Sequence, residues 1–170
     1  NLAVAPGLFR KEDFSGPRDT HYPTADRFCE GCGEAEVRQW LAKRNIGGIK
    51  RPLSVYVHLP FCNTICYYCA CNKVVTKDHG RSAKYIKYLA REMALVDELL
   101  GEDRSICQMH WGGGTPTFLS HAEMGTLREE LHRHFLPMPY AEDSIEIDPL
   151  KVGPGQLEFA AGLGCHRPAN

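Results

Sequence analysis

Three thiols lie within eight residues of one another in the stretch Phe61-Cys62-Asn63-Thr64-Ile65-Cys66-Tyr67-Tyr68-Cys69, where their spacing is C-x3-C-x2-C. A cubane iron–sulfur cluster has four irons, so a loop that supplies three thiolates leaves the fourth iron open to a small molecule. The spacing therefore favours an iron–sulfur site that also binds a ligand.

Two other kinds of site use cysteines, and neither matches this spacing well. A structural zinc site needs four ligands, which usually come from two C-x2-C knuckles, whereas a disulfide scaffold needs paired cysteines in a short secreted chain. The spacing alone still leaves zinc and unrelated thiols as alternatives, because short motifs also arise by chance.

The segments around the cysteines alternate between strand and helix patterns. An apolar run with β-branched residues predicts a strand at residues 53–59, directly before the cysteines. Apolar residues at helical spacing predict a helix at 82–100 that Gly101 ends, and Ser120 with Glu123 predicts the capped start of another helix. The other predicted elements are strands at 106–111 and 144–147 and helices at 34–43, 121–134 and 156–161.

Strands that alternate with helices predict parallel βαβ units, and three such units are visible before the approach to another strand. A closed barrel of eight units takes about 250 residues, so three units cannot close one. The carboxyl ends of parallel strands gather the functional loops of such folds. We therefore expect the cysteine stretch, the glycine run 112–114 and Glu146 to share one site.

The composition is that of an ordinary globular chain and argues against several classes of partner. With 170 residues, 43% of them hydrophobic and 24% charged, the chain can bury one core. A formal net charge of -1 gives no basic patch for nucleic acid, and no apolar run is long enough to cross a membrane. Eight cysteines without a recognisable signal peptide favour a reducing compartment, so we predict a cytoplasmic protein.

Family motifs surround the cysteines. The thiols with Tyr68 in the aromatic place resemble the C-x3-C-x-aromatic-C hallmark of the radical S-adenosylmethionine (SAM) enzymes. Within that superfamily, residues 13–164 resemble the oxygen-independent coproporphyrinogen III oxidases of haem biosynthesis. The runs that carry the resemblance are SGPRDTHYPTA (15–25), YVHLPFC (56–62), CACNK (69–73), HWGGGTPT (110–117) and SIEIDP (144–149).

The resemblance implies a fold and domain limits. Residues 51–170 would form the N-terminal part of an α/β, incomplete radical SAM (β/α) barrel, with its first three βα units. An extended N-terminal arm and a short helix would occupy residues 1–50. The chain would be the N-terminal fragment of a longer enzyme, and inactive alone.

The resemblance also implies a reaction, cofactors and partners. The activity would be the oxygen-independent oxidative decarboxylation of coproporphyrinogen III to protoporphyrinogen IX. Its cofactors would be a 4Fe-4S cluster and SAM, which supply a deoxyadenosyl radical, and its partner an unidentified low-potential electron donor. The alternative is a haem carrier that keeps the cluster fold but has no oxidase activity. Cys71 and the N-terminal arm favour the oxidase over this carrier.

Single residues receive roles from the resemblance. It implies that Cys62, Cys66 and Cys69 ligate the cluster and that six residues contact SAM, namely Tyr56, Tyr68, Gly113, Gly114, Thr115 and Glu146. Glycines at a strand end permit close approach, and we expect backbone donors there to reach the methionyl end of SAM. Tyr56 and His58 lie two apart on one strand, so they face the same side of the sheet.

Cys71 distinguishes this family from relatives that lack a cysteine there. It would be either a catalytic thiol beside the cluster, needed for turnover, or a fourth ligand that competes for the open iron. We favour the first, because a fourth ligand would displace SAM.

A few residues fall outside the family pattern. Cys29 and Cys32 form a C-x2-C pair with no second knuckle nearby, so we predict no functional role for them. Asp19 stands where the family usually has an aromatic residue, and Arg18 suits either a propionate or a structural ion pair. Four histidines lack a metal-ligand pattern with nearby acids, namely His110, His121, His132 and His134. We predict that His121, His132 and His134 lie on helix surfaces.

Overall fold

A computed structural model describes residues 27–44, 49–65, 69, 71–148, 152–165 and 167–169. The chain divides into two compact units, residues 1–37 and 38–170. Helix α2 (Glu34–Lys43) has the range predicted from the sequence, and none of its residues is buried. The predicted arm, with Arg18 and Asp19, lies outside the described residues, and the proposed domain boundary at residue 50 stays a prediction.

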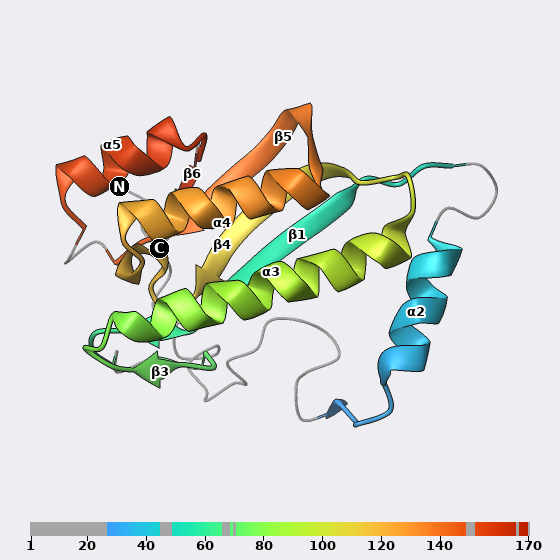
Figure 1. Cartoon of the computed structure of the whole chain (residues 1–170), viewed down its shortest axis with the longest axis horizontal. Helices are drawn as coiled ribbons and strands as arrows, with labels where there is room; N and C mark the ends of the chain where they lie inside the picture. Colours follow the sequence, from blue (N-terminus) through green and yellow to red (C-terminus); the bar gives the residue numbers. More distant parts are fainter. Residues whose placement is uncertain are drawn as a thin grey trace, which may run out of the picture. The chain divides into compact units, whose positions relative to one another are not determined.

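Four parallel strands form the main sheet of the second unit, in the order β1-β4-β5-β6 (Figure 1). These strands are β1 (Leu53–Leu59), β4 (Ser105–Gly113), β5 (Leu136–Glu146) and β6 (Arg167–Ala169). Helices α3 (Gly80–Leu100), α4 (His121–His134) and α5 (Pro154–Gly162) connect them in turn. The predicted βαβ units are confirmed, and β6 adds the first residues of the further strand that the sequence only approached.

One face of the sheet is apolar and packs on helices. Figure 1 shows α3 and α4 lying over this face. Val57, Trp111 and Ile145 come from three neighbouring strands, and each is at most 3% exposed. They join Leu127 and Leu131 of α4 in the hydrophobic core. Because side chains alternate along a strand, the residues between these core positions point to the opposite face.

The opposite face carries polar and aromatic side chains. Tyr56 of β1 pairs with His110 of β4, and His110 pairs with Ser144 of β5. A parallel sheet is normally buried on both faces, so a polar second face is typical of a strand layer that lines a ligand-binding lumen. The sequence pattern therefore places the candidate site on this face and at its carboxyl end.

Strand β5 is longer than the predicted strand at 144–147, and the two prolines at its start explain the difference. Ile106 pairs with Pro137, but the next pair is Gln108 with Glu142, so residues 138–141 form an unpaired insertion. Proline cannot donate to a sheet ladder and is tolerated at strand starts and bulges. The sequence pattern alone therefore predicts the start of β5 at too late a residue.

The start of α4 is fixed by the capping box that the sequence predicted. The side-chain oxygen of Ser120 accepts the backbone N–H of Glu123 at 3.3 Å, and the Glu123 carboxylate accepts the N–H of Ser120 at 2.9 Å. Ser82 of α3 adds a 2.5 Å hydrogen bond to the same carboxylate. Partial burial works against ionisation, but the hydrogen bonds from Ser82 and Ser120 lower the pKa of Glu123 below its ordinary value of 4.5.

We expect Glu123→Gln to reduce the free energy of unfolding by about 1 kcal/mol at neutral pH, the usual size of a capping interaction. Because folding lowers the pKa of Glu123, its stabilisation is complete above the unfolded-state pKa and is lost as the pH falls through the folded-state pKa. The difference between the two proteins should therefore shrink below about pH 4.5. Urea unfolding at pH 7 and below pH 4 checks this, and a constant difference would contradict it.

Candidate functional site

The first cysteine of the motif lies in a small second sheet that holds the cysteine loop. Strand β2 (Phe61–Cys62) pairs in parallel with β3 (Val74–Val75). The N–H of Val74 donates to Pro60 O at 2.7 Å, and the N–H of Thr76 donates to Cys62 O at 2.9 Å. The chain on both sides of the loop is therefore tied together. The sequence analysis missed this sheet, because a strand of two residues is too short to show a periodic pattern.

The glycine run packs directly against the first cysteine, as predicted. The N–H of Gly114 donates to Leu59 O and that of Thr115 donates to Phe61 O, both at 2.8 Å. The Thr115 hydroxyl lies 3.8 Å from the Cys62 sulfur. A Cβ on residue 114 would stand 2.7 Å from Phe61 O and 2.8 Å from that sulfur. Only glycine fits between the end of β4 and the buried thiol.

The N–H groups of the glycine run are used within the chain. Besides those of Gly114 and Thr115, the N–H of Gly113 donates to a carboxylate oxygen of Glu146 at 2.9 Å. The prediction that backbone donors here face a cofactor is therefore not supported by the hydrogen bonds. Gly113 itself has a φ of +112°, which side-chain-bearing residues rarely adopt.

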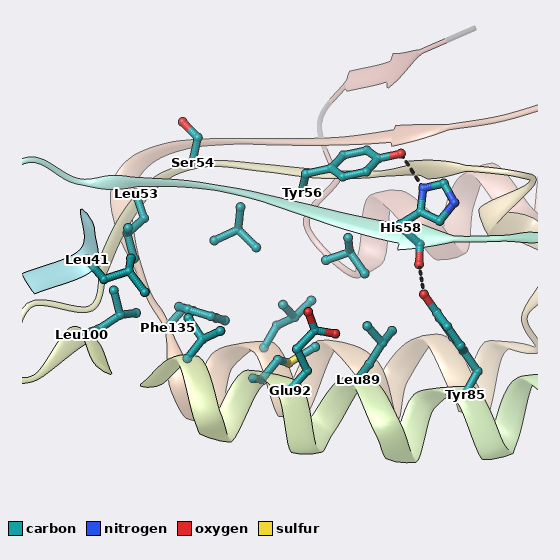
Figure 2. A pocket seen from close by; sticks show the side chains of 15 residues that line it. Leu41, Leu53, Ser54, Tyr56, His58, Tyr85, Leu89, Glu92, Leu100 and Phe135 are labelled. Carbon is teal, nitrogen blue, oxygen red and sulfur yellow. Dashed lines mark hydrogen bonds between the residues drawn. The ribbon is translucent and has the colours of Figure 1, made fainter. Parts of the chain in front are cut away.

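Tyr56 and His58 lie on the same side of β1, as predicted, and form one chain of hydrogen bonds (Figure 2). The Tyr56 hydroxyl is 3.0 Å from His58 Nδ1, and His58 Nε2 is 2.9 Å from Asn72 O in the cysteine loop. A carbonyl only accepts, so Nε2 carries the proton and Nδ1 accepts from Tyr56 in the neutral ring. Tyr85 of α3 donates to His58 O at 2.7 Å. The loop is thus fixed to β1 and, through β1, to α3.

Glu146 stands at the end of β5, beside His110, for which the sequence predicted no metal-binding role. Its second oxygen lies 3.3 Å from His110 Nε2, and the His110 ring stacks with that of Tyr56 at 5.8 Å between centroids. A signal for His110 was present, because it precedes Gly112 by two residues and so shares its face of β4. Partial burial, and then the charge of Glu146, raise the pKa of Tyr56.

The described thiols of the loop differ in exposure. Cys62 is buried, Cys69 is half-buried and Cys71 is exposed. Desolvation, the neighbouring Cys69 and Glu146 raise the pKa of Cys71. The predicted ligand Cys66 and the predicted adenine contact Tyr68 lie outside the described residues. In the part of the chain that the structure describes, no group of three metal-binding side chains gathers.

A cavity of about 440 Å³ lies between β1 and α3, and Tyr56 and His58 are among the residues that line it (Figure 2). Leu53, Leu89, Leu100 and Phe135 are among its mostly apolar lining, with the Glu92 carboxylate among them. Its walls belong largely to the apolar face of the sheet and to α3, so we assign no chemistry to it.

The structure also describes other residues that were named from the sequence. Cys29 and Cys32 are exposed thiols in the first unit. The prediction of a surface position is wrong for His134, which is largely buried and lies 2.9 Å from Asp97 of α3. Its imidazole ties the end of α4 to α3. His121 stacks on Phe159. None of the helices described reaches the length and hydropathy that crossing a membrane requires.

Known proteins similar to this chain share its motifs and its fold. The model of the radical SAM superfamily matches residues 56–169. The oxygen-independent coproporphyrinogen III oxidase of Pseudomonas aeruginosa is 46% identical over 94% of this chain and 35% of its own length. A protein of the same name from Mannheimia haemolytica is 41% identical over 84% of this chain and 94% of its own length.

A solved structure agrees with the sequence comparisons. The fold matches that of coproporphyrinogen III oxidase (HemN) from Escherichia coli with a TM-score of 0.79 and 38% identity, over 89% of this chain and 34% of that one. The chain thus spans about a third of the length of the P. aeruginosa relative and of this structure. The predicted α/β fold class, an incomplete radical SAM barrel, is confirmed. The chain belongs to the radical SAM superfamily and, within it, to the oxygen-independent coproporphyrinogen III oxidases.

Proposed function

We propose that this chain forms the cofactor-binding part of an enzyme that converts coproporphyrinogen III to protoporphyrinogen IX without oxygen. The observation that carries the proposal is the convergence of three segments at the carboxyl end of the sheet. Cys62 lies against Gly114, and Gly113 holds the carboxylate of Glu146. Three segments far apart in the sequence thus meet where parallel α/β folds bind their ligands.

The thiols suit a 4Fe-4S cluster that Cys62, Cys66 and Cys69 would hold. Thiolates are the usual ligands of such clusters, and Cys62 is already shielded from water by the glycine run. When bound, the cluster and SAM would supply a deoxyadenosyl radical that takes a hydrogen atom from a substrate propionate. The substrate radical would then lose carbon dioxide and pass one electron to a one-electron acceptor, which leaves a vinyl group.

The residues around the thiols would bind and orient SAM. These are Tyr56, Tyr68, Gly113, Gly114, Thr115 and Glu146. The N–H groups of Gly113, Gly114 and Thr115 donate within the chain, so we expect carbonyl oxygens of the run to accept from the SAM ammonium group. The Glu146 carboxylate is a second acceptor, and Tyr56 offers an aromatic surface beside it.

Cys71 would act beside the cluster as the catalytic thiol. It is exposed and follows the proposed ligand Cys69 by two residues, so it would lie close to the proposed SAM site. An unidentified low-potential electron donor would reduce the cluster, in the cytoplasm and without nucleic acid or membrane as partner.

A chimera tests the proposed function. In it, this chain replaces the matching 35% of the P. aeruginosa relative, to which it is 46% identical. After anaerobic reconstitution with iron and sulfide, the chimera should form protoporphyrinogen from coproporphyrinogen III with SAM and a chemical reductant. The 170-residue chain alone should not, because its open sheet leaves a strand edge unpaired and lacks the opposite wall of a substrate cavity.

Three outcomes of this experiment would count against the proposal. A reconstituted chimera that binds haem but never releases protoporphyrinogen would favour a haem carrier. Zinc in place of iron after reconstitution would favour a structural metal module. Multiple turnovers by the 170-residue chain alone would show that a barrel wall beyond this sheet is not needed.

A further inference from the structure

His110 lies at the centre of the polar face, between two residues proposed to bind SAM. Its Nδ1 is 2.7 Å from the Ser144 hydroxyl, and its Nε2 is 3.3 Å from Glu146 Oε1. The plane of its ring is tilted by only 17° from that of Tyr56. Both ring nitrogens and one ring face are therefore engaged by neighbours on β1 and β5.

The proton positions follow from the partners. A carboxylate only accepts hydrogen bonds, so Nε2 of His110 must donate to Glu146, and Nδ1 of the neutral ring must then accept from Ser144. Ser144 has a second acceptor in Met109 O, but that contact is longer, at 3.4 Å. The neutral His110 ring, protonated at Nε2, can therefore donate to Glu146 and accept from Ser144.

The Glu146 carboxylate is held from several directions. Its Oε2 accepts the N–H of Gly113 at 2.9 Å, and its Oε1 faces His110. A Cβ on Gly112 would stand 2.9 Å from both this carboxylate and the Tyr56 ring, so both side chains rest on the glycine. A carboxylate offers about four acceptor positions. Described residues of the chain take two of them, which leaves two for a ligand among the contacts that these residues make.

We propose that His110 is a positioning residue for SAM binding, a role that rests on the function proposed above. It holds the Glu146 carboxylate in the orientation that accepts a hydroxyl or ammonium donor of SAM, and it supports the Tyr56 ring by stacking. His110 itself does not touch the cofactor, because both its nitrogens serve the chain. A histidine that only fills the lumen would need neither the Ser144 nor the Glu146 hydrogen bond.

The test compares three substitutions in the iron-loaded chimera, with S-adenosylhomocysteine as the probe and equilibrium dialysis as the measurement. His110→Leu should weaken probe binding about tenfold, which corresponds to one lost hydrogen bond to a charged group. His110→Gln keeps an N–H donor at a similar reach and should stay within about threefold of the parent. Gln108→Leu is the matched control, because Gln108 lies two residues earlier on the same face and bonds to Ser54 at 3.3 Å. It should bind the probe as the parent does.

The outcomes separate this inference from the proposed function. A parent chimera that holds iron but does not bind the probe overturns the proposed function. If the parent binds and His110→Leu binds equally well, or if His110→Gln is as weak as His110→Leu, the positioning role is wrong. Loss of iron from His110→Leu would make the residue a structural support of the cluster loop, which also overturns the proposal.

Discussion

Cys62→Ala is expected to abolish iron–sulfur cluster binding. Thiolates hold such clusters, and the Cys62 sulfur is buried against the glycine run. Iron and sulfide content and visible absorbance after anaerobic reconstitution measure the effect. Cys107→Ala is the matched control, since Cys107 is a half-buried thiol on β4 near Leu53 O, at the other end of the strand. A Cys62→Ala protein that keeps its full iron content would refute the ligand assignment.

The same measurement separates Cys71 from the ligands. We expect Cys71→Ser in the chimera to keep its iron and to lose porphyrinogen turnover, because the role that we propose for this exposed thiol is chemical rather than ligating. Loss of the cluster from this variant would instead make Cys71 a ligand.

Gly114→Ala is expected to have the second large effect. The added Cβ would stand 2.7 Å from Phe61 O and 2.8 Å from Pro60 C, and both are backbone atoms that cannot rotate away. The end of β4 must then move from β2, which breaks the hydrogen bonds from Gly114 and Thr115 and displaces Cys62. Overpacking of this kind costs about 1–3 kcal/mol in the free energy of unfolding. We also expect most of the bound iron to be lost.

Gly125→Ala is the control for Gly114→Ala. Gly125 lies within α4, and a Cβ there would have no atom within 4 Å. Alanine in a helix interior is more favourable than glycine by about 0.5–1 kcal/mol, so this variant should be slightly more stable and should keep its iron. Urea unfolding and iron analysis of the two variants provide the comparison. Equal iron content in both would show that the close approach at Gly114 is not needed.

The regular elements of this chain could be predicted from local patterns. The strand at 53–59 and the helix at 34–43 have the predicted ranges, and α4 begins at its predicted capping box. Apolar spacing, caps and glycine stops act over a few residues, so they are visible without any tertiary contact. The early start of β5 could not be predicted, because only the partner strand shows that residues 138–141 form an insertion.

The sequence by itself determined the family of the chain and predicted the residues of its candidate site. The C-x3-C-x2-C spacing, the glycine run and Glu146 were all recognised as parts of one site, because each is a local signal at the end of a strand. Tertiary structure alone decided how these parts hold one another. The parallel register of the strands places His110 between Tyr56 and Glu146. It also brings the N–H of Gly113 within hydrogen-bond distance of the Glu146 carboxylate. Hydrogen bonds between residues some 30 to 50 positions apart depend on strand order and register, which no local pattern encodes.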